Sequence, residues 1–125
     1  MKILWLTLMV WACGPAQAPQ VSVIGNEELV ELLKNPDVQL VDVRTPEEVS
    51  YGIIENATII DFYDPKFEQK IAAFDKEKPI VLYCAAGGRS AQAGQRLAGL
   101  GFQEIYDLGV GFRGWKAGGY PIVER

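Results

Sequence analysis

Short runs of apolar residues alternate along the chain with segments whose apolar positions recur every three or four residues. The runs at 21–24, 38–43 and 79–83 are rich in β-branched and aliphatic side chains, and two weaker strand candidates lie at 58–60 and 103–106. Bounded apolar runs are typical of strands, and a continuous run predicts a strand that is buried on both faces. The runs at 38–43 and 79–83 are therefore expected to be neighbouring strands in the centre of a sheet.

The segments between these runs predict helices. Asn26 is a favourable N-cap for the first helix, Thr45 and Pro46 open the second, and Gly101 is expected to close the fourth. Strands that alternate with helices pair in parallel, with helices on both faces of the sheet. The predicted fold class is therefore α/β. The predicted helices lie at 27–34, 45–48, 66–74, 90–100 and 112–117.

The beginning of the chain does not follow this alternation. Lys2 precedes a short apolar run at residues 3–12, which is the pattern of a secretory signal. As a helix this run would reach only about 15 Å, against about 30 Å of bilayer hydrocarbon, so a permanent membrane span is disfavoured. We therefore expect residues 1–12 to be a signal peptide, 13–20 a tether and 21–124 the folded domain.

Two cleavage sites compete in this region. Residues 10–13, Val-Trp-Ala-Cys, resemble a bacterial lipobox, which would make Cys13 the lipidated first residue and attach the protein to a membrane. Residues 16–18, Ala-Gln-Ala, form a second site that Pro19 weakens, and an uncleaved core element is the third alternative. Both cleavage alternatives imply export, to the periplasm or as a membrane-anchored lipoprotein.

Composition narrows the classes of function. The chain has 125 residues, enough for one domain with one core, and its net charge of −4 argues against nucleic acid as a partner. It contains no histidine, which excludes Ser-His-Asp triads, Cys-His dyads and histidine-ligated metals. We therefore expect neither a metal site nor a cofactor, and any cysteine chemistry must activate its thiol without an imidazole.

The candidate chemistry lies directly after the 79–83 strand. Cys84 begins a loop that contains two glycines and Arg89 and leads into the helix at 90–100. Ligands of open α/β sheets bind beyond the carboxyl ends of strands, where a helix N-terminus presents unpaired N–H groups. A buried structural cysteine is the alternative. Hydrogen bonds from converging N–H groups, more than the helix dipole, would shift the Cys84 thiol towards thiolate.

Three motifs, in this order, resemble those of the rhodanese-like sulfurtransferases. Residues 40–48 resemble their upstream Asp-Val-Arg signature, 84–90 their active loop and 108–122 their C-terminal element. The resemblance covers about residues 21–124 and implies a small domain with a parallel sheet and helices on both faces. It further implies transfer of a sulfane sulfur from a donor such as thiosulfate to a thiophilic acceptor, both small molecules, through a persulfide on Cys84. The other loop residues that it implies in substrate binding are Ala85, Ala86, Gly87, Gly88 and Arg89.

Two other functions remain open. Cysteine phosphatases have a longer loop between cysteine and arginine, whereas four residues separate Cys84 from Arg89, which favours sulfur transfer over phosphatase or arsenate reductase chemistry. A non-catalytic module that uses the same fold to carry sulfur or to bind a partner is the second alternative, although a pure binding module would not need the thiol. The chain departs from the family pattern at Ile53, Asn56 and Val110, outside the active loop.

Several polar residues have two interpretations each. Arg89 would bind the sulfonate of a donor or tie the loop to a carboxylate. Asp42 and Arg44 are expected to form a structural polar network rather than to bind substrate. Solvated surface is expected for Arg113, and the N-terminus of a short helix for Glu48.

Overall fold

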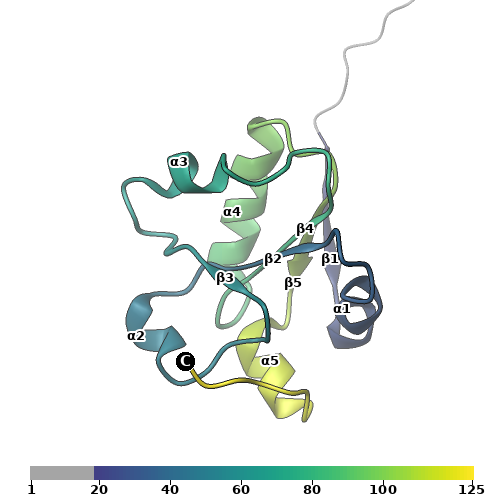
Figure 1. Cartoon of the computed structure of the whole chain (residues 1–125), viewed down its shortest axis with the longest axis vertical. Helices are drawn as coiled ribbons and strands as arrows, with labels where there is room; N and C mark the ends of the chain where they lie inside the picture. Colours follow the sequence, from purple (N-terminus) through teal and green to yellow (C-terminus); the bar gives the residue numbers. More distant parts are fainter. Residues whose placement is uncertain (1–18) are drawn as a thin grey trace, which may run out of the picture.

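The computed structural model of the protein describes residues 19–125, which form one sheet with helices packed against it (Figure 1). The expected signal peptide, Cys13 and most of the expected tether lie outside the described residues. Among the residues that are described, no helix is both long and apolar enough to span a bilayer.

The strands all run parallel, in the order β1-β5-β4-β2-β3. Every residue of β4 is buried, and β2 and β5 flank it. This arrangement confirms that the apolar runs at 38–43 and 79–83 are neighbouring interior strands. The strands are β1 (Val21–Ile24), β2 (Gln39–Asp42), β3 (Thr58–Ile59), β4 (Ile80–Tyr83) and β5 (Ile105–Leu108).

β5 begins later than the run at 103–106 predicts. Gln103 is exposed, and its backbone N–H donates to the turn that precedes β4 instead of to a neighbouring strand. Pairing starts at Ile105, which lies opposite Ile80 of β4. The strand therefore extends further along the chain than predicted and includes Asp107, which is buried.

Helices cover both faces of the sheet, which confirms the predicted α/β class (Figure 1). α1 and α5 pack on one face, where Leu29, Phe112 and Trp115 join the core. α3 and α4 pack on the other face through Phe67 and Leu97. The helices are α1 (Asn26–Leu32), α2 (Pro46–Val49), α3 (Phe67–Ile71), α4 (Gly88–Gly99) and α5 (Gly111–Ala117).

The starts of the first two helices differ in how well the sequence predicts them. Gly25, rather than Asn26, is the N-cap of α1, because the Asn26 side-chain amide donates to the Gly114 carbonyl at 3.1 Å and ties α1 to α5. Thr45 caps α2 with Pro46 at its first position, as predicted. The first case depends on a contact between distant segments, whereas the second depends on local capping alone.

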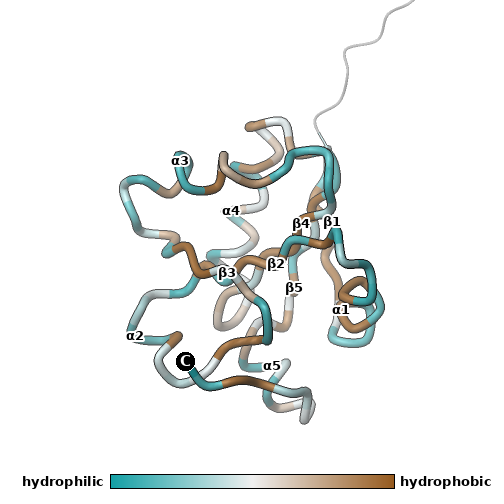
Figure 2. The backbone as a smooth tube through the Cα atoms, viewed as in Figure 1, coloured by the Kyte–Doolittle hydropathy of each residue, from teal (hydrophilic) through white to brown (hydrophobic). Residues whose placement is uncertain are grey.

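Apolar residues concentrate on the strands and on the inward sides of the helices (Figure 2). One ion pair lies inside this apolar region: Arg44 Nη2 is 2.7 Å from Asp42 Oδ2 and donates to the Gly52 carbonyl at 2.8 Å. The guanidinium also lies 3.9 Å above the ring of Phe112. The expected structural network of Asp42 and Arg44 is thus confirmed, and it ties the end of β2 to α5.

The three departures from the family pattern fit this fold. Ile53 is buried and forms an antiparallel bridge with Val123 near the C-terminus. Asn56 has φ of 68°, a left-handed conformation that asparagine tolerates better than most residues. Val110 is an exposed residue with ordinary backbone angles, while Gly111 after it keeps the positive φ.

Candidate active site

Cys84 lies at the carboxyl end of β4, in the middle of the sheet, where α4 and α5 both begin. The first N–H groups of a helix have no partner inside the helix. Those of Phe112 and Arg113 in α5 donate to the carbonyls of Cys84 and Ala85, at 2.8 Å and 3.1 Å. These hydrogen bonds from α5 fix the backbone of the loop. The N–H groups at the start of α4 are free to donate to the sulfur of Cys84.

Only one of the two loop glycines is required by the geometry. Gly87 has φ of 101°, and a Cβ there would lie 2.5 Å from the Gly109 carbonyl oxygen. Gly88 is the first residue of α4, two positions before the predicted start, and a Cβ there would meet nothing within 4 Å. The shape of the loop therefore requires a glycine at position 87 but not at position 88. Gly111, the first residue of α5, packs closely against the loop, and a Cβ there would lie 2.4 Å from the Ala85 carbonyl oxygen.

Cys84 is 1% exposed, and hydrogen-bond donors lie around its sulfur. The Gly87 N–H donates to Sγ at 3.1 Å, and the Ser90 hydroxyl lies 3.4 Å from it. Burial raises the pKa of the thiol, but the Ser90 hydroxyl and the N–H groups of Ser90, Ala86 and Gly87 lower it, and the net pKa is below its usual value. The loop therefore favours thiolate without a histidine.

Arg89 is paired with a carboxylate outside the loop. Its Nη1 and Nη2 donate to the two carboxylate oxygens of Glu48 in α2, at 2.6 Å and 2.8 Å. This pairing lowers the pKa of Glu48 to about 2 and raises that of Arg89, to which the charge of Cys84 also contributes. Of the two roles expected for Arg89, the structure shows the tie to a carboxylate. Glu48 also closes the capping box of α2 with Thr45, which is the only role its sequence context predicts.

A small cavity of about 290 Å³ opens beside the loop at Ala85. Arg113 is exposed, as expected, but it also lines this cavity. Within the described part of the chain, Arg113 has no ion-pair partner, whereas the other two arginines near the loop, Arg44 and Arg89, are paired. The other residues that line the cavity are Arg44, Glu47, Glu48, Tyr51 and Phe112.

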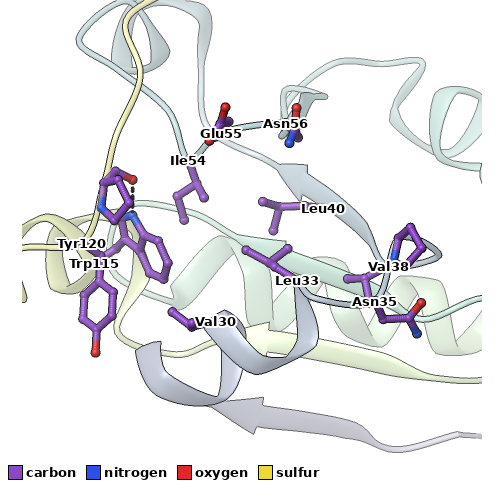
Figure 3. Close-up of a pocket in the computed structure, with 12 residues that line it drawn as sticks. Val30, Leu33, Asn35, Val38, Leu40, Ile54, Glu55, Asn56, Trp115 and Tyr120 are labelled. Atoms are coloured by element: carbon purple, nitrogen blue, oxygen red, sulfur yellow. Dashed lines mark hydrogen bonds between the residues drawn. The ribbon is translucent and has the colours of Figure 1, made fainter.

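A larger cavity of about 780 Å³ lies on the face of the sheet that α1 and α5 cover (Figure 3). Its walls are mainly apolar and include Leu33, Leu40, Ile54 and Trp115. None of residues 84–90 lines it, and its lining contains no cysteine, serine or threonine. Size alone therefore does not identify the reactive site, and the small cavity lined by Ala85, the residue after Cys84, is the better candidate.

Asp107 is a buried site residue that the sequence analysis missed. It lies in β5 and is 3% exposed, and burial raises its pKa, an effect that the Ser90 side chain partly offsets. An acidic residue within an apolar strand is a sequence signal for a buried functional carboxylate. The predicted strand ended at residue 106, so Asp107 was not recognised as part of a strand. Among residues 19–125, no group of three or more Cys, Asp or Glu side chains is placed to hold a metal ion.

Comparison with known proteins agrees with this geometry. The family model described as Rhodanese-like domain matches residues 25–118. The thiosulfate sulfurtransferase GlpE of Coxiella burnetii (strain RSA 331 / Henzerling II) is 36% identical over 94 residues, which covers 75% of this chain and 86% of that protein. A sulfurtransferase of Allochromatium vinosum is 34% identical over 104 residues, 82% of this chain and 95% of that protein.

Solved structures show the same likeness. The crystal structure of a rhodanese-related protein from Thermoplasma volcanium superposes with a TM-score of 0.74 at 32% identity, covering 83% of this chain and 99% of that one. The region that the family model matches contains the strands β2 to β5, all five helices and the loop that begins at Cys84. The chain therefore belongs to the rhodanese-like family, and its relatives include proteins named as sulfurtransferases.

Proposed function

We propose that the protein transfers a sulfane sulfur from thiosulfate to a thiophilic acceptor through a persulfide on Cys84. The observation that carries this proposal is the environment of one sulfur atom: it is buried, it accepts a hydrogen bond from Gly87, and its pKa is lowered by the surrounding donors. Thiolate is the nucleophilic form of cysteine, and a lowered pKa makes it available at neutral pH.

The reaction has two half-reactions. In the first, the Cys84 thiolate attacks the outer sulfur of thiosulfate; a new S–S bond forms, the S–S bond of thiosulfate breaks, and sulfite leaves with the electron pair. In the second, an acceptor such as cyanide attacks the outer sulfur of the persulfide, thiocyanate leaves, and the thiolate is restored. Sulfur anions arise in both half-reactions, so the same N–H donors stabilise both.

Thiosulfate is the proposed donor for two reasons. A relative that is 36% identical is named as a thiosulfate sulfurtransferase. The cavity beside Ala85 also offers the unpaired guanidinium of Arg113 to an anionic donor, although the carboxylates of Glu47 and Glu48 line the same cavity. Arg113→Ala should therefore raise KM for thiosulfate more than it lowers kcat, while Lys116→Ala, an exposed cation on the same helix that does not line the cavity, should leave both unchanged.

The decisive test is mass spectrometry of the protein after treatment with thiosulfate and again after cyanide. One additional sulfur should appear on the peptide that contains Cys84 and disappear when cyanide is added, with thiocyanate as product. Cys84→Ser, which folds around a side chain of similar size, should never gain the sulfur. If the wild-type protein gains no sulfur from thiosulfate, mercaptopyruvate or polysulfide, the enzymatic proposal is wrong, and the fold serves as a non-catalytic partner-binding module.

A further inference from the structure

Arg44 is a buried cation, and one nitrogen of its guanidinium has no partner in the fold. Its side chain is 4% exposed, and Nε and Nη2 donate to the Asp42 carboxylate at distances from 2.7 to 3.1 Å. Nη2 also donates to the Gly52 carbonyl. Nη1 makes no hydrogen bond within the described part of the chain. Two N–H groups of a buried arginine are therefore available to a ligand.

Nη1 faces the small cavity that Ala85 lines. In residues 19–125, the fully buried side-chain nitrogen and oxygen atoms without a partner are Asn26 Oδ1 and Asp107 Oδ1. Nη1 of Arg44 is not one of them, so it keeps contact with solvent although the residue as a whole is buried. Of the two cavities described above, Arg44 lines only the small one. Nη1 is therefore the part of Arg44 that this cavity exposes.

The sheet brings this nitrogen to the reactive loop. Asp42 at the end of β2 lies opposite Tyr83 at the end of β4, so Arg44 and Ala85 each follow their strand by two residues. Ligands of open α/β sheets bind at this edge, beyond the carboxyl ends of the strands. Ala85 is the residue after Cys84, so an anion held by Arg44 would lie beside the loop that carries the sulfur.

We propose that Arg44 Nη1 and the guanidinium of Arg113 together bind the oxyanion end of the sulfur donor. In the proposed function this end is the sulfonate group of thiosulfate, and the outer sulfur remains free for attack by Cys84. The identity of the donor rests on that function, whereas the anion site itself does not. Arg44 is then a substrate-binding residue in addition to its structural role beside Asp42.

The two arginines differ in how firmly they are held before a ligand binds. The Arg44 guanidinium is fixed by Asp42 on one edge and lies 3.9 Å from the centre of the Phe112 ring. A side chain that is already ordered loses little conformational entropy when it binds. Arg113 is exposed and has no ion-pair partner among the described residues, so it must be ordered by the ligand. Arg44 should therefore contribute most of the affinity.

Net charge alone does not make this cavity select anions. Glu47 and Glu48 line it, Glu48 and Arg44 are each paired, and the unpaired charges that remain, Glu47 and Arg113, have opposite signs. Recognition then depends on N–H groups with fixed directions. Such groups match the oxygens of a sulfonate or sulfate better than a spherical halide ion. The site should therefore prefer sulfate to chloride.

The first test uses the wild-type protein and inorganic sulfate, which has the same oxyanion but donates no sulfane sulfur. Sulfate should slow alkylation of the Cys84 peptide by iodoacetamide in a saturable way, and chloride at equal ionic strength should not. In NMR spectra, sulfate should shift the side-chain Nε–H signal of Arg44 and leave that of Arg96 in place. Absence of protection, or shifts confined to the backbone N–H groups at the start of α4, would overturn the proposal.

The second test replaces the fork of the guanidinium with a single cation. Arg44→Lys keeps a positive charge beside Asp42 but removes the free N–H pair, so KM for thiosulfate and the dissociation constant for sulfate should rise about tenfold or more. Transfer from a neutral organic trisulfide, which has no oxyanion, should change little. Arg96→Lys is the matched control, because Arg96 also stacks on an aromatic ring, 4.7 Å from that of Phe62, and does not line the cavity.

Each outcome of these tests separates the anion site from the reaction. Equal losses with thiosulfate and with the trisulfide would mean that Arg44 only supports the loop, and would overturn the proposal. If Arg44→Lys does not fold, the sulfate titration of the wild type still decides the matter. A wild-type protein that binds sulfate at Arg44 but gains no sulfur from any donor would refute the proposed function and leave the anion site standing.

Discussion

Gly87 is the position where one added methyl group should damage both the fold and the chemistry of the loop. Its φ of 101° is costly for any residue with a Cβ, by about 1–3 kcal/mol. The new Cβ would also lie 2.5 Å from the Gly109 carbonyl oxygen, so one of the two backbones must move by about 1 Å to restore ordinary contact. Overpacking of this kind costs about a further 1–3 kcal/mol.

Gly87→Ala should therefore destabilise the domain by at least about 2 kcal/mol, which lowers Tm by at least about 8 °C for a domain of this size. The same movement takes the Gly87 N–H away from Cys84 Sγ, which it contacts at 3.1 Å. Loss of one hydrogen bond to a charged group should raise the pKa of the thiol by about one unit, so alkylation of Cys84 at neutral pH should slow severalfold.

Gly88→Ala is the matched control, because it adds the same methyl group at the next residue. A Cβ there has open space, and the position begins α4 without a positive φ. The variant should gain about 0.4–1 kcal/mol from the less flexible unfolded chain and should keep the alkylation rate of Cys84. Thermal unfolding and iodoacetamide labelling measure both effects. Equal stability and equal labelling of the two variants would refute the argument from loop geometry.

Two further predictions concern the α2–α4 ion pair and the N-terminus. The pKa of Glu48 falls from 4.5 to about 2 on folding, so its stabilisation is present above pH 4.5 and is lost as the pH falls towards about 2. Because the Glu48 side chain is 33% exposed, we expect solvent to reduce this stabilisation to about 1–2 kcal/mol. In urea unfolding, Glu48→Gln should lack this acid dependence and Glu47→Gln should keep it; identical acid profiles for Glu48→Gln and the wild type would contradict the assignment. Intact mass from a bacterial host should lack residues 1–12 and show lipid on Cys13, whereas a retained Met1 or an N-terminal Pro19 would reject the lipobox interpretation.

The features that could be predicted from sequence are those fixed by local pattern. The continuous apolar runs at 38–43 and 79–83 have the pattern of interior parallel strands, and the structure places them side by side. Thr45 and Pro46 define the start of α2 by capping chemistry that involves only adjacent residues. The expected helix at 66–74 is shorter, Phe67–Ile71, because the chain turns after Ile71 although its apolar spacing continues.

The features that sequence missed depend on contacts between distant segments. Glu48 and Arg89 are 41 positions apart, and they meet because α2 and the first turn of α4 lie at the same edge of the sheet. Asp107 lies inside β5 only when the strand has the register that puts Ile105, and not Gln103, at the start of pairing. The predicted strand was placed two residues too early, at 103–106. Asp107 therefore fell outside the predicted strand, and its burial was not foreseen.

The absence of histidine makes the rigidity of the loop more important than it would be beside an imidazole base. A helix dipole contributes about 0.3–1 kcal/mol, too little to make a thiolate dominant at neutral pH, so most of the shift must come from N–H groups aimed at one point. Such groups act only while their directions are fixed. The carbonyls of Cys84 and Ala85 accept hydrogen bonds from the first turn of α5, and Gly87 packs against Gly109. The start of α5 and the residues just before it therefore fix the position of the loop. In the proposed reaction, the sulfur would therefore gain and lose a second sulfur atom without a change in the backbone that stabilises it. Substitutions at the start of α5 should alter the acidity of Cys84, although they touch neither its side chain nor a substrate.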